Sequence, residues 1–548
     1  MAQPLVVRDL SFRYRSRDEY ALRDISFALD EGEILLVAGA SGCGKTTLIR
    51  CINGLIPRSY KGEVSGDVIL EDQDVFRYSL ARISQLVGTV LQDPERQILG
   101  SKVAAEVAFG LENLGLSRSE IRERMSQAMA LLGIEHLKER ETFLLSGGEK
   151  QKVALAGVLA MEPKVLLLDE PLASLDPASA QEALRLFRKL ADGGISILLV
   201  EHRVEDTMLI DPDRVMYMKD SQIKYLGSIA GMMDVVDHSE LKLPAEIVIQ
   251  RSIDSPSPVL VPAIQPNGRE SLISFQDVSF AYSSDSPTVI HNVNLAIRKG
   301  DITAILGPNG AGKTTLVKHA IGLLKPTQGQ VLVGESDSQK LSVAQIASTV
   351  GYVFQSPSHM LFAPTVKQEL EFGPTNLEHD PKVMEENVKR AIETVNMVGL
   401  EENPPLSLSF GQQKRVSIAA ILAMQSKILV MDEPTAGQDY ANYVAFMDSI
   451  IQMPGFEAIL FITHDVDLAV RYANRVILVH DGQVAADGEP EQVLTDSVLL
   501  ERCNIVSTTL LQANIDYLPQ TGNFMSAETL ARHYGDMGGD AYSRKSVH

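Results

Sequence analysis

The chain carries the same glycine-rich loop twice, and this repeat constrains its fold more than any other feature of the sequence. The first copy reads Gly39-Ala40-Ser41-Gly42-Cys43-Gly44-Lys45-Thr46-Thr47, and the second reads Gly307-Pro308-Asn309-Gly310-Ala311-Gly312-Lys313-Thr314-Thr315. Both copies fit the phosphate-loop pattern G-x-x-x-x-G-K-S/T. Glycines let successive backbone N–H groups point at one anion, and the N-terminus of the following helix adds partial positive charge. The two loops therefore predict two phosphate-binding sites.

The residues around the first loop give the motif the context that it requires. The apolar run 34–38 predicts a buried strand before the loop, and a helix-compatible segment begins at Thr46. In such a strand–loop–helix unit we expect Lys45 to reach the β- and γ-phosphates of a nucleotide and the Thr46 hydroxyl to hold Mg²⁺. Lys313 and Thr314 take the same roles in the second copy.

Other landmarks repeat at nearly the same spacing, which indicates a duplication. Lys45 and Lys313 lie 268 positions apart (313 − 45), as do Tyr14 and Tyr282. The spacing is 263 for Gln92 and Gln355, Ser146 and Ser409, and Glu170 and Glu433, and it is 262 for His202 and His464. We therefore predict two copies of one unit, at 1–235 and 271–500, joined by a linker at 236–270 and followed by a tail at 501–548.

Each unit is predicted to be an α/β domain. Alternating apolar residues over 5–14 and 21–29 predict antiparallel strands, and 64–70 and 86–91 predict further strands. Helical and charged patterns from about Ser101 to Leu145 are followed by short apolar runs typical of buried parallel strands. This alternation favours an α/β sheet with phosphate at its carboxyl edge. The linker is rich in Pro and Ser and is predicted to be partly extended, and the end of the tail, 535–540, is predicted to be flexible.

Composition excludes several classes of protein. Apolar residues make up 45 %, and the longest apolar runs are strand-sized, far from the roughly 18 residues that a membrane span needs. The N-terminus shows no signal peptide pattern. Cys43, Cys51 and Cys503 cannot form a disulfide framework, which fits a reducing, cytosolic setting. The net charge of −21 argues against a general nucleic-acid surface.

Two apolar runs end in a pair of acids, Asp169-Glu170 and Asp432-Glu433. A carboxylate at a strand tip can orient Mg²⁺ and its waters, which is the role predicted for Asp169 and Asp432. The next carboxylate can polarise a water for in-line attack on the γ-phosphate, so Glu170 and Glu433 are the predicted catalytic carboxylates.

A serine and glycines precede a helical run in each unit. The first stretch is Leu145-Ser146-Gly147-Gly148-Glu149 and the second is Leu408-Ser409-Phe410-Gly411-Gln412. A helix N-terminus of this composition is an anion site, although on its own it is equally an ordinary helix cap with a glycine turn.

Together, these motifs resemble the ATPase subunit of an ATP-binding cassette (ABC) transporter with two fused nucleotide-binding domains. The resemblance implies two tandem P-loop NTPase domains, each with a RecA-like core, an antiparallel β subdomain and a helical subdomain. It implies ATP as substrate, Mg²⁺ as cofactor, and a place at the cytoplasmic face of the membrane beside integral membrane subunits. In that family the Leu-Ser-Gly-Gly-Gln signature closes over ATP bound to the opposite domain, so the two units would pair head to tail.

The resemblance also implies residue roles. Gln92 and Gln355 match the Q-loop glutamines, which sense Mg²⁺ and the γ-phosphate, and His202 and His464 match the switch histidines, which contact the γ-phosphate. Ser174-Leu175-Asp176 and Gly437-Gln438-Asp439 occupy the D-loop positions. Tyr14 and Tyr282 match the aromatic that stacks on adenine, with core packing as the alternative role.

These assignments define the predicted sites. The catalytic residues are Glu170, Glu433, His202 and His464. The ATP contacts are the nine residues of each loop with Tyr14, Gln92, Ser146, Gly147 and Gly148, and with Tyr282, Gln355, Ser409 and Gly411. The Mg²⁺ contacts are Thr46, Gln92, Asp169, Thr314, Gln355 and Asp432.

A finer resemblance is to the energy-coupling-factor branch, which imports vitamins and transition-metal ions such as cobalt through a transmembrane coupling protein and a separate substrate-binding membrane protein. It is carried by 90–97 and 106–110, echoed at 353–357 and 369–373. One alternative is the fused ATPase of a sugar or peptide importer. Another is a soluble tandem-cassette protein that acts on ribosomes or nucleic acid, which the nearly uncharged linker and the acidic net charge disfavour.

Two departures from the family pattern predict unequal ATP sites. Phe410 replaces the first signature glycine, and Thr435-Ala436-Gly437-Gln438-Asp439 lacks the usual D-loop sequence. In a head-to-tail pair, ATP on Lys45 faces Ser409 and Gly411, while ATP on Lys313 faces Ser146 and Gly148. The segments 93–110 and 356–373, beside the Q-loops, are the predicted docking surfaces for the membrane partner.

Overall fold

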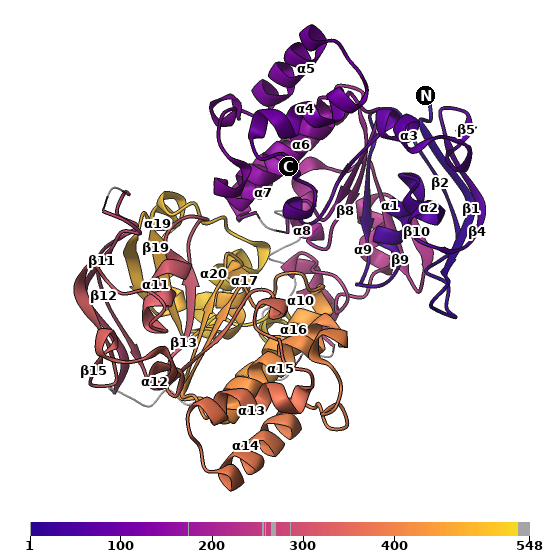
Figure 1. Cartoon of the computed structure of the whole chain (residues 1–548). Coiled ribbons are helices and arrows are strands. Elements are labelled where there is room, and N and C mark those ends of the chain that lie inside the picture. Colours follow the sequence, from indigo (N-terminus) through magenta and orange to yellow (C-terminus); the bar gives the residue numbers. More distant parts are fainter. Residues whose placement is uncertain are drawn as a thin grey trace. The chain divides into compact units, whose positions relative to one another are not determined.

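The computed structural model describes residues 2–173, 175–254, 257, 259–264, 270–284 and 286–534. The predicted D-loop residue Ser174, part of the Pro/Ser-rich linker and the tail end 535–540 lie outside these residues. The chain forms two compact units (Figure 1). The first unit comprises residues up to Leu243 with Asp439–Ala441, and the second comprises Pro244–Gln438 with the chain from Asn442 onward.

The first unit contains two sheets. The antiparallel sheet has the order β2-β1-β4-β5, with β1 at Leu5–Tyr14, β2 at Leu22–Leu29, β4 at Gly62–Leu70 and β5 at Gln73–Asp74. The second sheet has the order β10-β9-β3-β8-β7-β6, with β3 at Ile34–Ala38, β6 at Val87–Val90, β7 at Val165–Asp169, β8 at Ser196–Val200, β9 at Arg214–Lys219 and β10 at Gln222–Gly227. Its strands are parallel except for β10.

The helices of the first unit fall into two groups (Figure 1). A lobe that projects from the sheets contains α4 (Val103–Asn113), α5 (Arg118–Leu131) and α6 (Gly147–Leu159). The others are α1 (Lys45–Ile52), α2 (Leu55–Arg58), α3 (Leu80–Leu86), α7 (Pro177–Asp192), α8 (Val204–Thr207) and α9 (Ile229–Val235).

The second unit repeats this plan, as the duplication predicts. Its antiparallel sheet has the order β12-β11-β14-β15, with β11 at Ser271–Phe280, β12 at Ile290–Arg298, β14 at Gln328–Val333 and β15 at Ser336–Asp337. Its larger sheet has the order β16-β17-β18-β13-β19-β20, with β13 at Ile302–Leu306, β16 at Val350–Val353, β17 at Ile428–Asp432, β18 at Ala458–Ile462, β19 at Arg475–His480 and β20 at Gln483–Gly488. The strand order is the same as in the first unit, which confirms the predicted fold class.

The helices of the second unit follow the same pattern, with additions at its beginning and end. The repeated helices are α11 (Lys313–Ala320), α12 (Val343–Ala347), α13 (Val366–Asn376), α14 (Pro381–Thr394), α15 (Phe410–Ala423), α16 (Tyr440–Ile451), α17 (Val466–Tyr472) and α18 (Pro490–Val493). The additions are α10 (Ala245–Ser252), α19 (Ser497–Arg502), α20 (Thr509–Thr521) and α21 (Ala527–Tyr534).

The structure adds helices to the segments predicted as linker and tail, whose boundaries remain a prediction. Helix α10 lies within 236–270 and packs with α20 and α21 of the tail. The Ala245 amide donates to Thr509 Oγ1 over 2.8 Å, and Arg471 of α17 pairs with Glu528 of α21 at 3.2 Å. Helices α10, α20 and α21 therefore pack with one another, and α20 and α21 contact α17. Among the described residues, no helix combines the length and the apolar character needed to cross a bilayer.

A hydrophobic cluster lies between the two sheets of each unit. In the first unit, Leu5 and Phe12 of β1 pack with Leu35 of β3 and with Leu48 and Ile52 of α1. All five residues of β3 are buried, since helices and the other sheet cover both of its faces, and this explains its uninterrupted apolar sequence.

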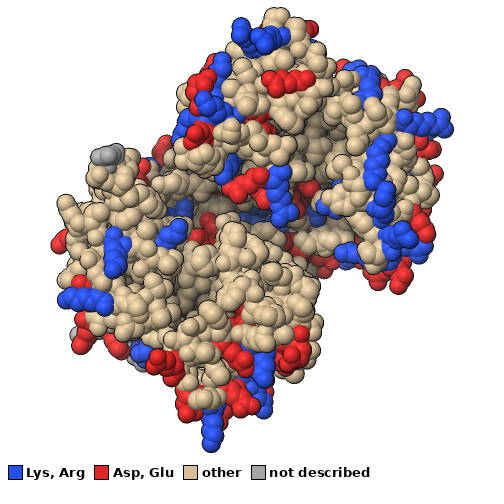
Figure 2. Space-filling model, in the orientation of Figure 1, with Lys and Arg blue, Asp and Glu red and all other residues tan. Residues whose placement is uncertain are grey.

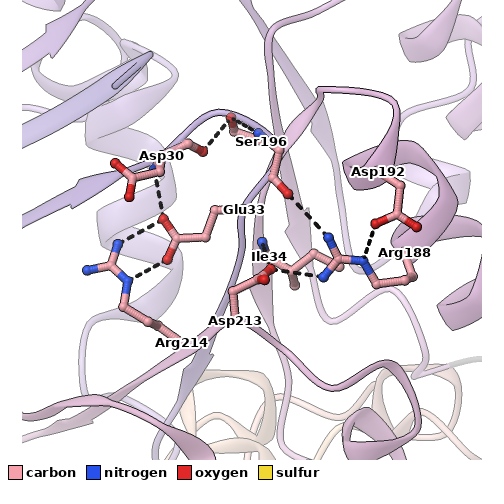
Figure 3. Close-up of polar contacts among 9 residues, drawn as sticks. Asp30, Glu33, Ile34, Arg188, Asp192, Ser196, Asp213 and Arg214 are labelled. Carbon is pink, nitrogen blue, oxygen red and sulfur yellow. Dashed lines mark hydrogen bonds and ion pairs between the residues drawn. The ribbon is translucent and has the colours of Figure 1, made fainter. Parts of the chain in front are cut away.

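A polar network fixes the beginning of β3, at the sheet edge opposite the phosphate loop (Figure 3). Arg214 Nε and Nη2 donate to the two oxygens of Glu33 over 2.5 and 2.8 Å. The Ile34 amide donates to Asp213 over 2.8 Å, and Arg188 donates to the same carboxylate over 2.9 Å. Because these bonds join the flanking strands and α7 to β3, they hold the strand that presents the first phosphate loop.

Candidate functional site

The functional residues of each unit converge at one edge of the larger sheet. In the first unit, β3, β6, β7 and β8 run parallel, so the residues that follow them lie at the same edge. The phosphate loop follows β3, Gln92 follows β6, Asp169 and Glu170 stand at the end of β7, and His202 follows β8. This is the carboxyl edge at which the sequence predicts phosphate to bind.

Glycines are required where the phosphate loop leaves the strand. Gly39 and Gly307 have φ of 154° and 151°. A Cβ on Gly39 would lie 2.3 Å from the Met218 carbonyl oxygen, and one on Gly307 would lie 2.1 Å from that of Val479. The loop therefore packs against the neighbouring strand only when these positions have no side chain.

Each loop holds its own lysine. Lys45 Nζ donates to the Gly39 and Ala40 carbonyls over 2.6 and 2.9 Å. Lys313 Nζ donates to the equivalent carbonyls, of Gly307 and Pro308, over 2.8 and 2.9 Å. Both lysines are buried, so each ammonium group is fixed within the loop that the sequence predicts to bind phosphate.

Oxygen ligands suited to Mg²⁺ lie together in both units. Thr46 Oγ1 donates to Asp169 over 3.4 Å, and Thr314 Oγ1 donates to Asp432 over 3.3 Å. Burial, reinforced by the neighbouring Glu170 carboxylate, raises the pKa of Asp169 to about 6. A pair of oxygens fits Mg²⁺, because this ion keeps several waters and binds substrate phosphate in addition to one or two protein ligands.

The predicted catalytic carboxylates contact the predicted switch histidines. Glu170 Oε1 lies 2.7 Å from His202 Nε2, and Glu433 Oε1 lies 3.0 Å from His464 Nδ1. Both glutamates have positive φ, 51° and 45°, a strained backbone that is often found at functional positions. Gln92 Nε2 also donates to Glu170 Oε2 over 2.6 Å. The structure thus brings Gln92, Glu170 and His202 into one hydrogen-bonded group.

The surroundings of these carboxylates keep them ionised. Burial by itself raises the pKa of Glu170, but the hydrogen bond and charge of His202 and the charge of Lys45 outweigh it and lower the pKa below its usual value. The pKa of Glu433 is lowered in the same way, with His464 and Lys313 opposing the effect of burial. An ionised carboxylate is the form that can accept a proton from water.

The two predicted adenine-stacking tyrosines are anchored to their loops. Tyr14 Oη lies 3.2 Å from Thr47 Oγ1, and Tyr282 Oη lies 3.1 Å from Thr315 Oγ1. Arg50 also donates to Tyr14 Oη over 3.2 Å. Tyr282 is exposed and Tyr14 is half-buried, so neither ring is enclosed in the core, although each meets the preceding phenylalanine edge-on.

The predicted signature serines cap the N-termini of helices and, in the part of the chain that the structure describes, do not bond the phosphate loop of their own unit. Ser146 caps α6 and forms a reciprocal capping box with Glu149, and Ser409 caps α15 with Gln412 in the same way. Within the described residues, no hydrogen bond joins either serine to the phosphate loop of its own unit. Such a helix N-terminus can serve an anion supplied from elsewhere.

Comparison with known proteins identifies the family. The sequence matches the family model described as ABC transporter over residues 22–173 and 290–436. This chain belongs to the ABC transporter family. It is an ABC-type ATPase with two cassettes in one chain.

The similarity extends along nearly the whole ABC ATPase. A protein of Methanosarcina mazei described as an ABC transporter ATP-binding protein is 34 % identical over 537 residues, 91 % of each chain. A protein of Streptococcus pneumoniae serotype 4 with the same description is 36 % identical over 92 % of this chain and 94 % of the relative. A solved structure of cbiO1 from Clostridium perfringens, described as part of the ABC transporter complex cbiONQ, is 31 % identical over 43 % of this chain and 95 % of that chain, with a TM-score of 0.39.

Several residues next to the ABC cassette motifs were not predicted from the sequence. Tyr352 Oη donates to Asp432 over 2.7 Å, whereas Thr89 occupies the equivalent place in β6 of the first unit. Glu201 accepts from the Leu172 amide over 2.9 Å, and Arg203 donates to the Leu172 carbonyl over 2.6 Å. Alignment of the two copies could have found them, because each position differs between the units.

Proposed function

We propose that this ABC ATPase energises a membrane importer of the energy-coupling-factor type, for vitamins or transition-metal ions. The subfamily assignment rests on the sequence resemblance at 90–97 and 106–110 and at 353–357 and 369–373. The ATPase of a sugar or peptide importer would share the mechanism and differ in cargo, because in this architecture the membrane partner selects the substrate.

The observation that carries the ATPase mechanism is the group formed by Gln92, Glu170 and His202 beside the Lys45 loop. Loop amides and Lys45 bind the β- and γ-phosphates, and the ionised Glu170 accepts a proton from the attacking water. His202 and Gln92 orient the Glu170 carboxylate and contact the γ-phosphate. Mg²⁺, held by Thr46 and Asp169, would neutralise charge on the phosphates.

The second unit supplies the same roles from Lys313, Thr314, Asp432, Glu433 and His464. In our proposal the two units pair head to tail, so that each ATP touches the loop of one unit and the signature helix of the other. Ser409 and Gly411 would complete the site on Lys45, and Ser146 with Gly148 would complete the site on Lys313. ATP then closes the pair and hydrolysis reopens it, which is a ligand-biased two-state switch.

Exposed apolar residues support docking to a membrane subunit beside each Q-loop. Leu99 is 73 % exposed and Phe362 is 62 % exposed, and Phe109 and Phe372 are exposed nearby in sequence on α4 and α13. The Leu99 amide donates to Glu106 over 2.8 Å, and the Phe362 amide donates to Glu369 over 2.9 Å. Because both acids are buried, they fix the loops that present these apolar side chains, as a preformed docking surface requires.

A ribosome- or nucleic-acid-acting ATPase is the rival from another class. Figure 2 shows acidic side chains interspersed with the basic ones over both units on the face drawn. Such mixed charge gives little support to binding a nucleic-acid backbone, which favours clustered Lys and Arg.

The test is co-expression of the chain with and without the membrane proteins encoded beside it, followed by cell fractionation and uptake assays. We expect the chain to sediment with membranes, and vitamin or metal uptake to occur, only with these partners. Leu99→Glu with Phe362→Glu should abolish both, whereas Val498→Glu, at a residue 75 % exposed on α19, should not. Co-sedimentation with ribosomes and never with membranes would contradict the importer.

A further inference from the structure

A buried lysine links the signature helix of the second unit to the loop that follows its catalytic carboxylate. Lys414 is only 1 % exposed and lies one turn after Phe410 on α15. Its Nζ donates to the Pro434 carbonyl, in a short contact, and to the Ala436 carbonyl over 3.5 Å. Since Pro434 directly follows Glu433, this ammonium group holds the backbone next to the predicted catalytic residue.

Two aromatic rings cover the same ammonium group. Lys414 Nζ lies 5.1 Å from the centre of the Phe410 ring and 5.7 Å from that of Phe446 on α16. A charge removed from water is costly unless it gains compensating partners, and aromatic faces attract cations at these distances. Burial lowers the pKa of Lys414 to about 7, while the charge of Glu433 opposes the shift. Phe410 therefore has a structural reason to replace a signature glycine.

In the first unit, other side chains bond the loop that follows the catalytic glutamate. Gln151, the counterpart of Lys414 (414 − 263), donates its amide to the Pro171 carbonyl, and Gly147 stands where the second unit has Phe410. In the first unit the cation that bonds this loop is Arg203, which follows β8 and does not lie on the signature helix. Arg203 donates to the Leu172 carbonyl over 2.6 Å. The second unit has Asp465 at that position, so Lys414 supplies the cation there.

We propose that Lys414 and Phe410 act as a coupled pair of positioning residues for ATP hydrolysis at Glu433. The lysine fixes the Pro434–Ala436 backbone and thereby the orientation of Glu433, and the Phe410 ring stabilises the buried ammonium group. Phe410 thus serves the active site of its own unit, in addition to any effect on ATP held by Lys45. This inference rests on the proposed role of Glu433.

The test measures hydrolysis in two backgrounds, each with one catalytic glutamate replaced. Lys414→Met keeps the volume of the side chain but removes the donor and the charge. In the Glu170→Gln background, where Glu433 is the remaining base, Lys414→Met should lower kcat about tenfold, since small misplacement of a reacting group costs this much or more, and should leave KM for ATP nearly unchanged. In the Glu433→Gln background it should leave kcat within about twofold.

Control variants separate positioning from general damage. Lys427→Met removes a lysine that is 52 % exposed and should have no effect in either background. Phe410→Gly should lower kcat less than Lys414→Met does in the Glu170→Gln background. Phe410→Gly with Lys414→Gln recreates the Gly147 and Gln151 pair and should recover part of the loss, a non-additive result expected of residues in contact.

The outcomes distinguish this inference from the function on which it rests. Equal loss of kcat in both backgrounds, or loss confined to KM or to thermal stability, would overturn the positioning role and leave the ATPase intact. If a background turns over too slowly, single-turnover hydrolysis of bound ATP gives the same comparison. Wild-type kcat in Glu433→Gln would instead show that Glu433 is not the base, which is a failure of the proposed function itself.

Discussion

The loop after Glu170 is held by Gln151, Arg203 and Glu201, whereas the loop after Glu433 is held by Lys414 and Gln438. The strand order behind the two loops is the same, and both glutamates adopt positive φ beside a histidine. The backbone position of the carboxylate is thus common to both units, while its supporting side chains differ. A duplicated fold can therefore keep one reaction geometry with different polar networks.

The beginning of the central strand shows the same principle. Arg214 of the first unit bonds Glu33, as in Figure 3. Its counterpart Arg475 bonds Asp301 over 2.6 Å and adds two bonds to Asp487, over 2.7 and 2.6 Å. Both units keep an arginine at this place, but the second unit surrounds it with more carboxylates and buries it more deeply.

The largest expected effect is the loss of ATP hydrolysis when both predicted catalytic carboxylates are replaced. Glu170→Gln with Glu433→Gln should reduce Mg²⁺-dependent ATP hydrolysis by about 10²–10⁴, because a water-polarising base typically contributes this much. Steady-state phosphate release measures the loss, and retained ATP binding shows that the sites remain folded. A double variant that hydrolyses ATP at the wild-type rate would exclude these residues as bases.

The arginine comparison predicts unequal stability. Arg475→Ala should cost about 2 kcal/mol of unfolding free energy, since it removes a buried arginine together with its hydrogen bonds to Asp301 and Asp487. Arg214→Ala should cost about 1 kcal/mol, because the Arg214 side chain is more exposed than that of Arg475 and Glu33 keeps the hydrogen bond from the Asp30 amide. Urea unfolding, with hydrogen exchange to assign the loss to β3 or β13, measures both. Equal costs would show that Asp487, the additional carboxylate of the second unit, contributes nothing.

Tyr352 sharpens the comparison of the two Mg²⁺ sites. Its hydroxyl bonds Asp432 over 2.7 Å and helps to lower the pKa of that carboxyl, which burial raises. Tyr352→Phe should weaken Mg²⁺ binding at the second site about tenfold, as loss of a supporting hydrogen bond commonly does. Mg²⁺ titration of ATP hydrolysis in the Glu170→Gln background measures this, and Thr89→Val is the matched control. An unchanged Mg²⁺ dependence would remove Tyr352 from the site.

A pH dependence of stability is also expected from Lys414. Burial lowers its folded pKa to about 7, below the usual value of about 10.4. Between these values the unfolded chain binds more of this proton than the folded chain, whose ammonium group is lost progressively as the pH rises above about 7, so stability should rise with pH, by at most about 1.4 kcal/mol per pH unit. Below pH 7 the cost of the buried charge is fully present. Unfolding midpoints from pH 6 to 9 should rise less steeply in Lys414→Met, and parallel curves would contradict this assignment.

Much of the fold was predictable because its signals are local. The glycine loops, the apolar strands ending in Asp-Glu and the regular spacing of the copies each depend on a short stretch of sequence. Lys414 was not predictable in the same way, because a lysine near a helix start is usually solvated, and only tertiary packing places it beneath Phe410. Helix α10 was missed because it lies in a Pro/Ser-rich segment and is stabilised by α20 and α21, more than 250 residues away.

The non-equivalence of the two ATP sites is tested most directly by comparing Lys45→Ala with Lys313→Ala in ATPase assays. Photo-crosslinked ATP, followed by mass spectrometry of the labelled peptides, gives the occupancy of each loop. We expect Lys313→Ala to reduce hydrolysis more than Lys45→Ala, because Phe410 is predicted to perturb ATP on Lys45 while Lys414 supports Glu433. The non-equivalence of the two sites would be contradicted if both variants fold, lose the same activity and show the same ATP occupancy at the loop that keeps its lysine.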